Sequence, residues 1–177
     1  MKRIFLLLAA ALSLAPGIWP ATRPRFGGTL RVETRGAISS FDITDDPTAA
    51  RALLRDLILS NVCDRLVTLN GNGDPQPSLA TSWRTEQDGR SWYFLLRDVP
   101  LHNGNMLTPQ AVVTALSAQN PEWHARANGN ELLIQSDTPL PNILYQLAEP
   151  HNSVCLVGNN GEWIGSGPFQ IGDFQPG

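Results

Sequence analysis

The sequence predicts a single mixed α/β domain. Its 177 residues are about one domain in length. Segments with strand-like alternation of apolar residues are interleaved with segments whose apolar residues recur at helical spacing. The 15 glycines and 14 prolines are typical of a loop-rich fold that contains strands rather than of a helical bundle. A hydrophobic content of 42% with 16% charged residues excludes an intrinsically disordered chain.

The amino end has the pattern of an export signal. Lys2 and Arg3 precede an apolar run over residues 4–15, which Pro16 ends. The run is shorter than the roughly 20 apolar residues that a membrane-spanning helix needs, so residues 1–21 are predicted to be a secretory signal peptide. The alternative is an uncleaved signal that tethers the chain to the membrane, because the cleavage site is poorly defined.

A strand and a helix are predicted next. Residues 29–34 alternate and follow a Gly-Gly pair, as at the start of a strand. Residues 45–47 (Asp-Asp-Pro) supply a helix cap followed by a first-turn proline, and the helix is predicted to reach about Val62. Its predicted buried stripe comprises Leu53, Leu54, Leu57 and Ile58.

Two hairpins and a second helix make up the middle of the chain. A short strand over 65–69 ends in the turn cluster 70–74, and a hairpin is predicted around the Asp-Gly turn at 87–90. Thr108 as cap and Pro109 in the first turn predict a helix to about Gln119. The other predicted segments are the hairpin strands 83–86, 91–97, 122–127 and 131–136, a short helix over 141–147, and strands over 154–157 and 169–174.

The two cysteines leave two interpretations open. If the chain is exported, Cys63 and Cys155 enter an oxidising compartment and a disulfide is available to them. The other interpretation is a pair of buried small hydrophobes, because both lie in apolar segments. Neither cysteine has the spacing or the histidine neighbour of a zinc or redox site.

The sequence contains no recognisable catalytic motif. His102, His124 and His151 are scattered, so no local metal site is predicted. The run 165–167 (Gly-Ser-Gly) precedes Pro168 and a predicted strand, so no helix amino terminus is available there to bind phosphate. No nucleophilic elbow and no His-Glu-x-x-His motif occurs. We therefore expect no enzyme activity, no catalytic residue, no cofactor and no metal.

Several spaced motifs resemble one known family. They are Leu79-Ala80-Thr81-Ser82-Trp83, Asp88-Gly89, Trp92 to Arg97, and His102-Asn103-Gly104, flanked by Gly27-Gly28-Thr29-Leu30 and Gly165-Ser166-Gly167-Pro168-Phe169. Their order and content, over residues 27–177, are similar to the signature of family 5 extracellular solute-binding proteins. These are the oligopeptide-, dipeptide- and nickel-binding receptors of ABC importers. Two departures are Ala111, where the family usually has Asp, and Met106, where it usually has Pro.

The resemblance implies a type II periplasmic-binding-protein fold, present as a partial first lobe. Residues 22–45 and 158–177 are then expected to be main-lobe strands, and 46–157 the smaller subdomain. Receptors of this family enclose their ligand between two lobes that close by hinge motion. Because the chain stops at Gly177, where the family continues, we expect a truncated or split receptor. A location in the periplasm and a monomeric state are also expected.

The resemblance also implies partners and ligand-contacting loops. The expected partners are a peptide or other small solute and the ABC permease in the inner membrane. A net charge of −3 offers no basic field, so no nucleic-acid partner is expected. The cleft-facing candidates are the loop Ser39, Ser40, Phe41 and Asp42 and the loop His151 and Asn152. The signature residues themselves are expected to be mostly scaffold, with the tryptophans in the core.

The main alternative belongs to another class of protein. A small secreted carbohydrate-binding or adhesion domain would present an exposed row of tryptophans, here Trp83, Trp92, Trp123 and Trp163. Burial of Trp83 and Trp92 would instead favour a receptor scaffold. A secreted hydrolase is a weaker third hypothesis, because no nucleophile–base pair can be assembled from local motifs.

Overall fold

The computed structural model describes residues 49–86 and 88–172, with side chains from residue 56 onward. The predicted signal peptide, the strand over 29–34, the helix cap at 45–47 and the loop of Ser39, Ser40, Phe41 and Asp42 lie outside the described residues. The helices are α2 (Ala49–Val62), α3 (Pro109–Gln119), α4 (Ile143–Gln146) and the 3-10 turn η2 (Pro150–Asn152). The strands are β1 (Val67–Leu69), β2 (Pro75–Pro77), β3 (Ala80–Thr85), β4 (Ser91–Leu96), β5 (His124–Asn128), β6 (Glu131–Gln135), β7 (Leu156–Val157) and β8 (Trp163–Ile164).

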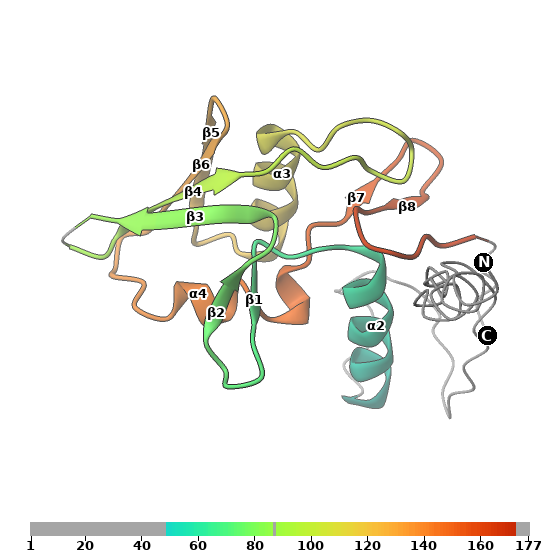
Figure 1. Ribbon diagram of the computed structural model, residues 1–177, viewed down its shortest axis with the longest axis horizontal. Helices are drawn as coiled ribbons and strands as arrows, with labels where there is room; N and C mark the ends of the chain where they lie inside the picture. Colours follow the sequence, from blue (N-terminus) through green and yellow to red (C-terminus); the bar gives the residue numbers. More distant parts are fainter. Residues whose placement is uncertain (1–48, 87, 173–177) are drawn as a thin grey trace, which may run out of the picture. The chain divides into compact units, whose positions relative to one another are not determined.

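A four-stranded antiparallel sheet in the order β3-β4-β6-β5 is the centre of the described part (Figure 1). Both predicted hairpins are confirmed. The β3–β4 turn is closed by a hydrogen bond from Gly89 N to Glu86 O (3.0 Å), and Gly89 has φ 67°, which glycine adopts readily. The β5–β6 turn likewise places Gly129 at φ 59°. The two hairpins join through β4 and β6, which pair Phe94 with Leu132.

Helix α3 covers one face of this sheet. Its cap is confirmed, since the Thr108 side chain accepts a hydrogen bond from Ala111 N (3.2 Å) although the family's usual acid is absent at that position. The fully buried side chains between helix and sheet are Phe94, Val112, Leu116, Leu132 and Ile134. Burial of these side chains supplies the main apolar contribution to the stability of this layer.

Helix α2 ends at Val62 as predicted, but the buried stripe predicted for it is wrong in its described part. Leu57 is 54% exposed and Ile58 is only half-buried, whereas Leu59, Val62 and Cys63 are buried. The reason is tertiary: this helix packs against η2 and the segment after it, and these partners select a face rotated from the predicted one. The side chains of Leu53 and Leu54 lie outside the described ones.

Two short hairpins complete the described part, and both depart from the predicted pattern. β1 pairs with β2, a Pro-Gln-Pro strand. This strand was not predicted, because prolines are unfavourable in strands. β7 pairs with the unpredicted β8, and only the last two residues of the segment predicted over 154–157 are a strand. The strand predicted over 169–174 is wrong for Phe169–Gly172, because Phe169 N donates to Asn61 O (3.2 Å) at the end of α2 rather than to a strand.

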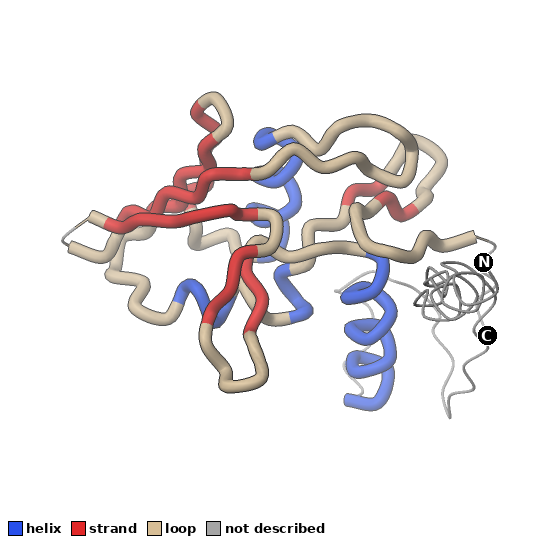
Figure 2. The backbone as a smooth tube through the Cα atoms, in the orientation of Figure 1, coloured by secondary structure: helices blue, strands red, loops and turns tan. Residues whose placement is uncertain are grey.

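A long loop between β4 and α3 runs beside the segment that follows β8 (Figure 2). The contact is a hydrogen bond from His102 N to Gly165 O (3.0 Å). This places two of the family-like motifs side by side, although they are about 60 residues apart in the sequence. None of the helices in the described residues is long and apolar enough to cross a membrane.

Candidate functional site

His151 and Asn152, one of the two predicted ligand-contacting loops, lie in η2. Their side chains differ in exposure: His151 is exposed, whereas Asn152 is 3% exposed. Asn152 Nδ2 donates to Gln146 O (2.8 Å), and its Oδ1 accepts from Asn120 Nδ2 (2.7 Å). The amide of Asn152 is therefore used inside the fold, and His151 is the residue of the pair that is accessible to a ligand.

A small pocket lies beside His151. It is formed by α2, the carboxyl end of α3 and the segments around η2 and β8, and it has room for about one water molecule. Its lining includes Asp56, Leu59, Gln119, His151, Ser153 and Trp163. Apolar and polar groups thus share the wall, as in most small-molecule sites.

Two buried polar atoms of residues that line this pocket lack hydrogen-bond partners in the described part of the chain. They are Gln119 Oε1 and Ser153 Oγ. Gln119 Nε2 donates to Ser153 O (3.1 Å), which fixes the orientation of the amide. Leaving each such atom unpaired costs about 1–3 kcal/mol. Sequence reasoning missed both residues, because each is an ordinary polar residue whose burial depends on tertiary packing.

The segment that carries Ser153 is held from two sides. Val154 N donates to Asp64 O (2.8 Å), and Cys155 forms a disulfide with Cys63, with a Cα–Cα distance of 5.4 Å. The disulfide interpretation of the two cysteines is therefore the one that the structure adopts. The pocket wall is consequently fixed to the carboxyl end of α2 before any ligand binds.

The family-like motifs meet at the end of α2, on the scaffold rather than at the pocket. Asp64 Oδ2 lies 3.6 Å from Arg97 Nη2 and accepts a hydrogen bond from Ser166 Oγ (2.9 Å). Gly167 N donates to Val62 O (2.9 Å), so that one of the unpaired carbonyls at the helix end is satisfied. These residues tie three distant segments together.

His102 contributes to the same junction through both ring nitrogens. Its Nε2 lies 2.8 Å from Gly167 O, and its Nδ1 lies 3.3 Å from Gly165 N. A carbonyl accepts and an amide donates, so the pair of contacts requires the neutral ring with the proton on Nε2. His102 therefore acts in the structure as a connector of backbone groups.

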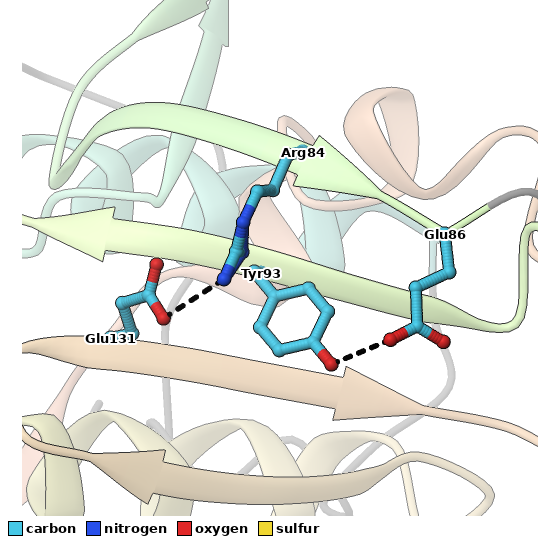
Figure 3. Close-up of polar contacts among 4 residues, drawn as sticks. All are labelled: Arg84, Glu86, Tyr93 and Glu131. Carbon is cyan, nitrogen blue, oxygen red and sulfur yellow. Dashed lines mark hydrogen bonds and ion pairs between the residues drawn. The ribbon is translucent and has the colours of Figure 1, made fainter.

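A second polar cluster occupies the outer face of the sheet, away from α3 (Figure 3). Arg84 lies over the ring of Tyr93, 3.9 Å from its centroid, and forms an ion pair with Glu131 (3.2 Å). The Tyr93 hydroxyl donates to Glu86 Oε1 (2.8 Å). This hydrogen bond, together with the negative charge of Glu86, raises the pKa of Tyr93. The cluster lies on the open surface and its hydroxyl has a raised pKa, which makes it harder to ionise, so we assign the cluster to the sheet surface.

The four tryptophans of the described residues do not form an exposed row. Trp123 is buried, while Trp83, Trp92 and Trp163 are half-buried, and Trp83 and Trp92 pack against the core. The burial criterion thus favours a scaffold role for them. Within the described residues no group of three His, Cys, Asp or Glu side chains is placed to hold a metal ion.

Comparisons by sequence and by structure give different outcomes. No protein-family model and no curated protein matches the sequence. Among solved structures, the nickel ABC transporter from Bacillus halodurans matches 80% of this chain with a TM-score of 0.67 and 25% identity. The periplasmic binding protein DppA from Helicobacter pylori, in complex with a peptide, matches 80% of this chain with a TM-score of 0.64 and 19% identity. The murein tripeptide binding protein MppA from Escherichia coli matches 79% with a TM-score of 0.62 and 20% identity.

These matches confirm the predicted fold class. The chain has the mixed α/β fold of periplasmic binding proteins, in part: it spans 32% of the nickel transporter chain, 36% of DppA and 35% of MppA. The first neighbour is a nickel ABC transporter protein, DppA is a periplasmic binding protein associated with an ABC transporter, and MppA binds a murein tripeptide. The fold thus agrees with the family that the sequence motifs resemble.

Proposed function

We propose that this chain is the amino-terminal portion of the substrate-binding component of an ABC importer for peptides or similar small solutes. The observation that carries the proposal is the match of about 80% of the chain to solute-binding proteins of such transporters. The structure adds that the family-like motifs, around Asp64, His102 and Gly165, converge on one junction. Motifs that serve the fold rather than the ligand are expected to persist among receptors for different solutes.

The proposed organisation follows the type II binding-protein plan. Residues 22–45 and the carboxyl-terminal segment belong to the main lobe, and the segment from residue 46 forms the smaller subdomain. The expected boundary at residue 157 falls inside the β7–β8 hairpin, so we propose that the return to the main lobe begins after Ile164. From that point the chain contacts the end of α2 through Gly167.

We further propose that the solute is held against one wall supplied by this chain. The contacts on this wall are Ser39, Ser40, Phe41 and Asp42 in one loop and His151 in the other, while Asn152 positions His151. The opposite wall is a second lobe outside the 177 residues, since the matched part of this chain covers only 32% and 36% of the chains of these two neighbours. A single wall cannot bury most of a solute's surface, which a tight pocket requires.

The proposal includes transport rather than catalysis. The chain is exported through its signal peptide, works as a monomer in the periplasm and delivers its solute to the permease. The neighbours are transport binding proteins, which is compatible with a protein that catalyses no reaction. The carbohydrate-binding alternative loses its support, because the tryptophans it requires are buried or half-buried.

Two experiments test the proposal. First, mass spectrometry of the periplasmic fraction should find a chain shortened by about 15–25 residues at its amino end. Finding only the full-length chain in the cytosol contradicts export. Second, the coding sequence that follows codon 177, in frame or after one frameshift, is expressed together with this chain and the product is titrated with di- and oligopeptides and with nickel. Saturable binding that requires the added segment supports the proposal, and its absence for every solute contradicts it.

A further inference from the structure

The pocket beside His151 has a chemical preference that its unpaired atoms define. Gln119 Oε1 is an acceptor only, and Ser153 Oγ can accept or donate. A group that satisfies both must therefore bring at least one N–H or O–H donor. An anionic head such as a carboxylate brings only acceptors and would meet the Gln119 oxygen unfavourably.

The geometry of the pocket is fixed without an occupant. Gln119 cannot turn its amide over without losing the hydrogen bond from Nε2 to Ser153 O. Ser153 is 2% exposed, and its backbone N donates to Pro150 O (3.1 Å). The neighbouring Cys155 is held by the disulfide to Cys63. Both unpaired atoms are therefore kept in place, so binding would cost little ordering of the protein.

We propose that this pocket binds the ammonium head of a primary amine. An ammonium group is about the size of a water molecule, which is the space available. It donates up to three hydrogen bonds, so it can serve Gln119 Oε1 and Ser153 Oγ at once. Asp56 is also among the residues that line the pocket. Under the proposed function, on which this step rests for its physiological ligand, the head is the amino group of an amine-containing solute.

The test uses the full 177-residue chain and ammonium chloride as the probe. Side-chain amide resonances of Gln119 and the indole resonance of Trp163 are followed by nuclear magnetic resonance during the titration. Potassium chloride at equal concentration is the control, because potassium has the same charge and nearly the same size but no N–H donor. We expect saturable shifts at both residues with ammonium that potassium does not reproduce. Equal shifts with both salts, or none with either, overturn the proposal and leave an ordered water as the occupant.

Single-residue variants test whether ammonium binds at this pocket rather than elsewhere on the chain. Ser153→Ala should weaken the apparent Kd for ammonium about three- to tenfold, which is the effect of losing one hydrogen bond. Gln119→Met removes the acceptor Oε1, together with the Nε2 donor, at similar size, so it should weaken ammonium binding. The matched control is Gln110→Met, at an exposed position of the same helix, which should leave the Kd unchanged. If Gln119→Met and Gln110→Met have equal effects, the proposal is wrong, whereas the proposed transport function is not affected.

Discussion

At the scale of single residues, close approach of two backbone segments limits substitution at two glycines. Gly165 and Gly167 lie against the last carbonyls of α2, so close that a Cβ at either position would overlap the Val62 backbone. A rigid helix end cannot move away as a side-chain tip can. The Gly-Ser-Gly run thus has a steric role, which explains the motif without any phosphate or ligand.

We predict that Gly165→Ala lowers the free energy of unfolding by about 1–3 kcal/mol or more, because the added methyl overpacks this contact. The measurement is urea denaturation followed by tryptophan fluorescence. Gly172→Ala is the matched control, since a Cβ there has nothing within 4 Å. If both variants unfold at the same urea concentration, the close approach at Gly165 is not present in the protein.

The Tyr93 hydroxyl gives a prediction about pH. Its hydrogen bond to Glu86 raises its pKa above that in the unfolded chain. A raised pKa means that the contribution to stability is complete below the unfolded value of about 10 and is lost as the pH rises through the folded value. The experiment uses a Tyr145→Phe background, in which Tyr93 is the remaining tyrosine of the two in the sequence. Glu86→Gln should lower the pKa measured from tyrosinate absorbance, whereas Glu122→Gln should not.

Residue roles were the hardest to predict from the sequence. Thr108, Gly89 and Gly129 act through local backbone geometry, so their neighbours in the sequence were sufficient to predict them. Ser153 carries no local signal, because its burial depends on a helix about 35 residues away. Asn152 was predicted from family resemblance to face a cleft, yet its amide bonds inside the fold.

At the scale of elements, the amino end of α3 is stabilised by its own cap. Thr108→Ala should lower the free energy of unfolding by about 0.5–2 kcal/mol, because Ala111 N then loses its acceptor. Thr114→Ala in the same helix is the control: its hydroxyl only donates to Gln110 O, and alanine favours helices, so little change is expected. Equal losses in the two variants would show that the cap does not contribute.

The disulfide joins the end of α2 to the segment after η2. With a sequence separation of 92 residues, the chain-entropy model gives a stabilisation of about 4–5 kcal/mol. Replacing both Cys63 and Cys155 by alanine should lower the free energy of unfolding by a large part of that amount, as measured by urea denaturation. The untreated chain should also be destabilised by dithiothreitol and the double variant should not. A double variant as stable as the parent would contradict the bond.

Helices and strands could be predicted from the sequence where the signal lies in neighbouring residues. The prediction failed where tertiary contacts decide the structure. The hairpins at 87–90 and 128–130 follow from glycine turns between alternating segments. The face of α2 and the absence of a strand at Phe169 depend on what packs against them, namely η2 and the helix end itself. The β1–β2 hairpin was missed because prolines usually exclude strands.

At the scale of the whole molecule, the described residues share one hydrophobic core. The sheet, α3 and α4 share buried side chains, among them Phe94, Leu132, Ile143 and Leu147. Near the end of α2, in contrast, Leu57 and Phe169 remain 54% and 53% exposed. This arrangement agrees with the proposal that the chain is one wall of a larger, two-lobed receptor.

The most direct test of that claim is calorimetric titration of the purified 177-residue chain with mixed di- and oligopeptides. DppA, which has been solved with a bound peptide, serves as the positive control for the titration. A receptor wall alone buries too little of a peptide, so we predict no saturable binding tighter than about 10 μM, or roughly −7 kcal/mol. Weak binding of an amine head at the pocket remains compatible with this prediction. Saturable binding tighter than about 10 μM would show that the chain forms a complete site by itself, and would contradict the proposal of a shared, two-lobed site.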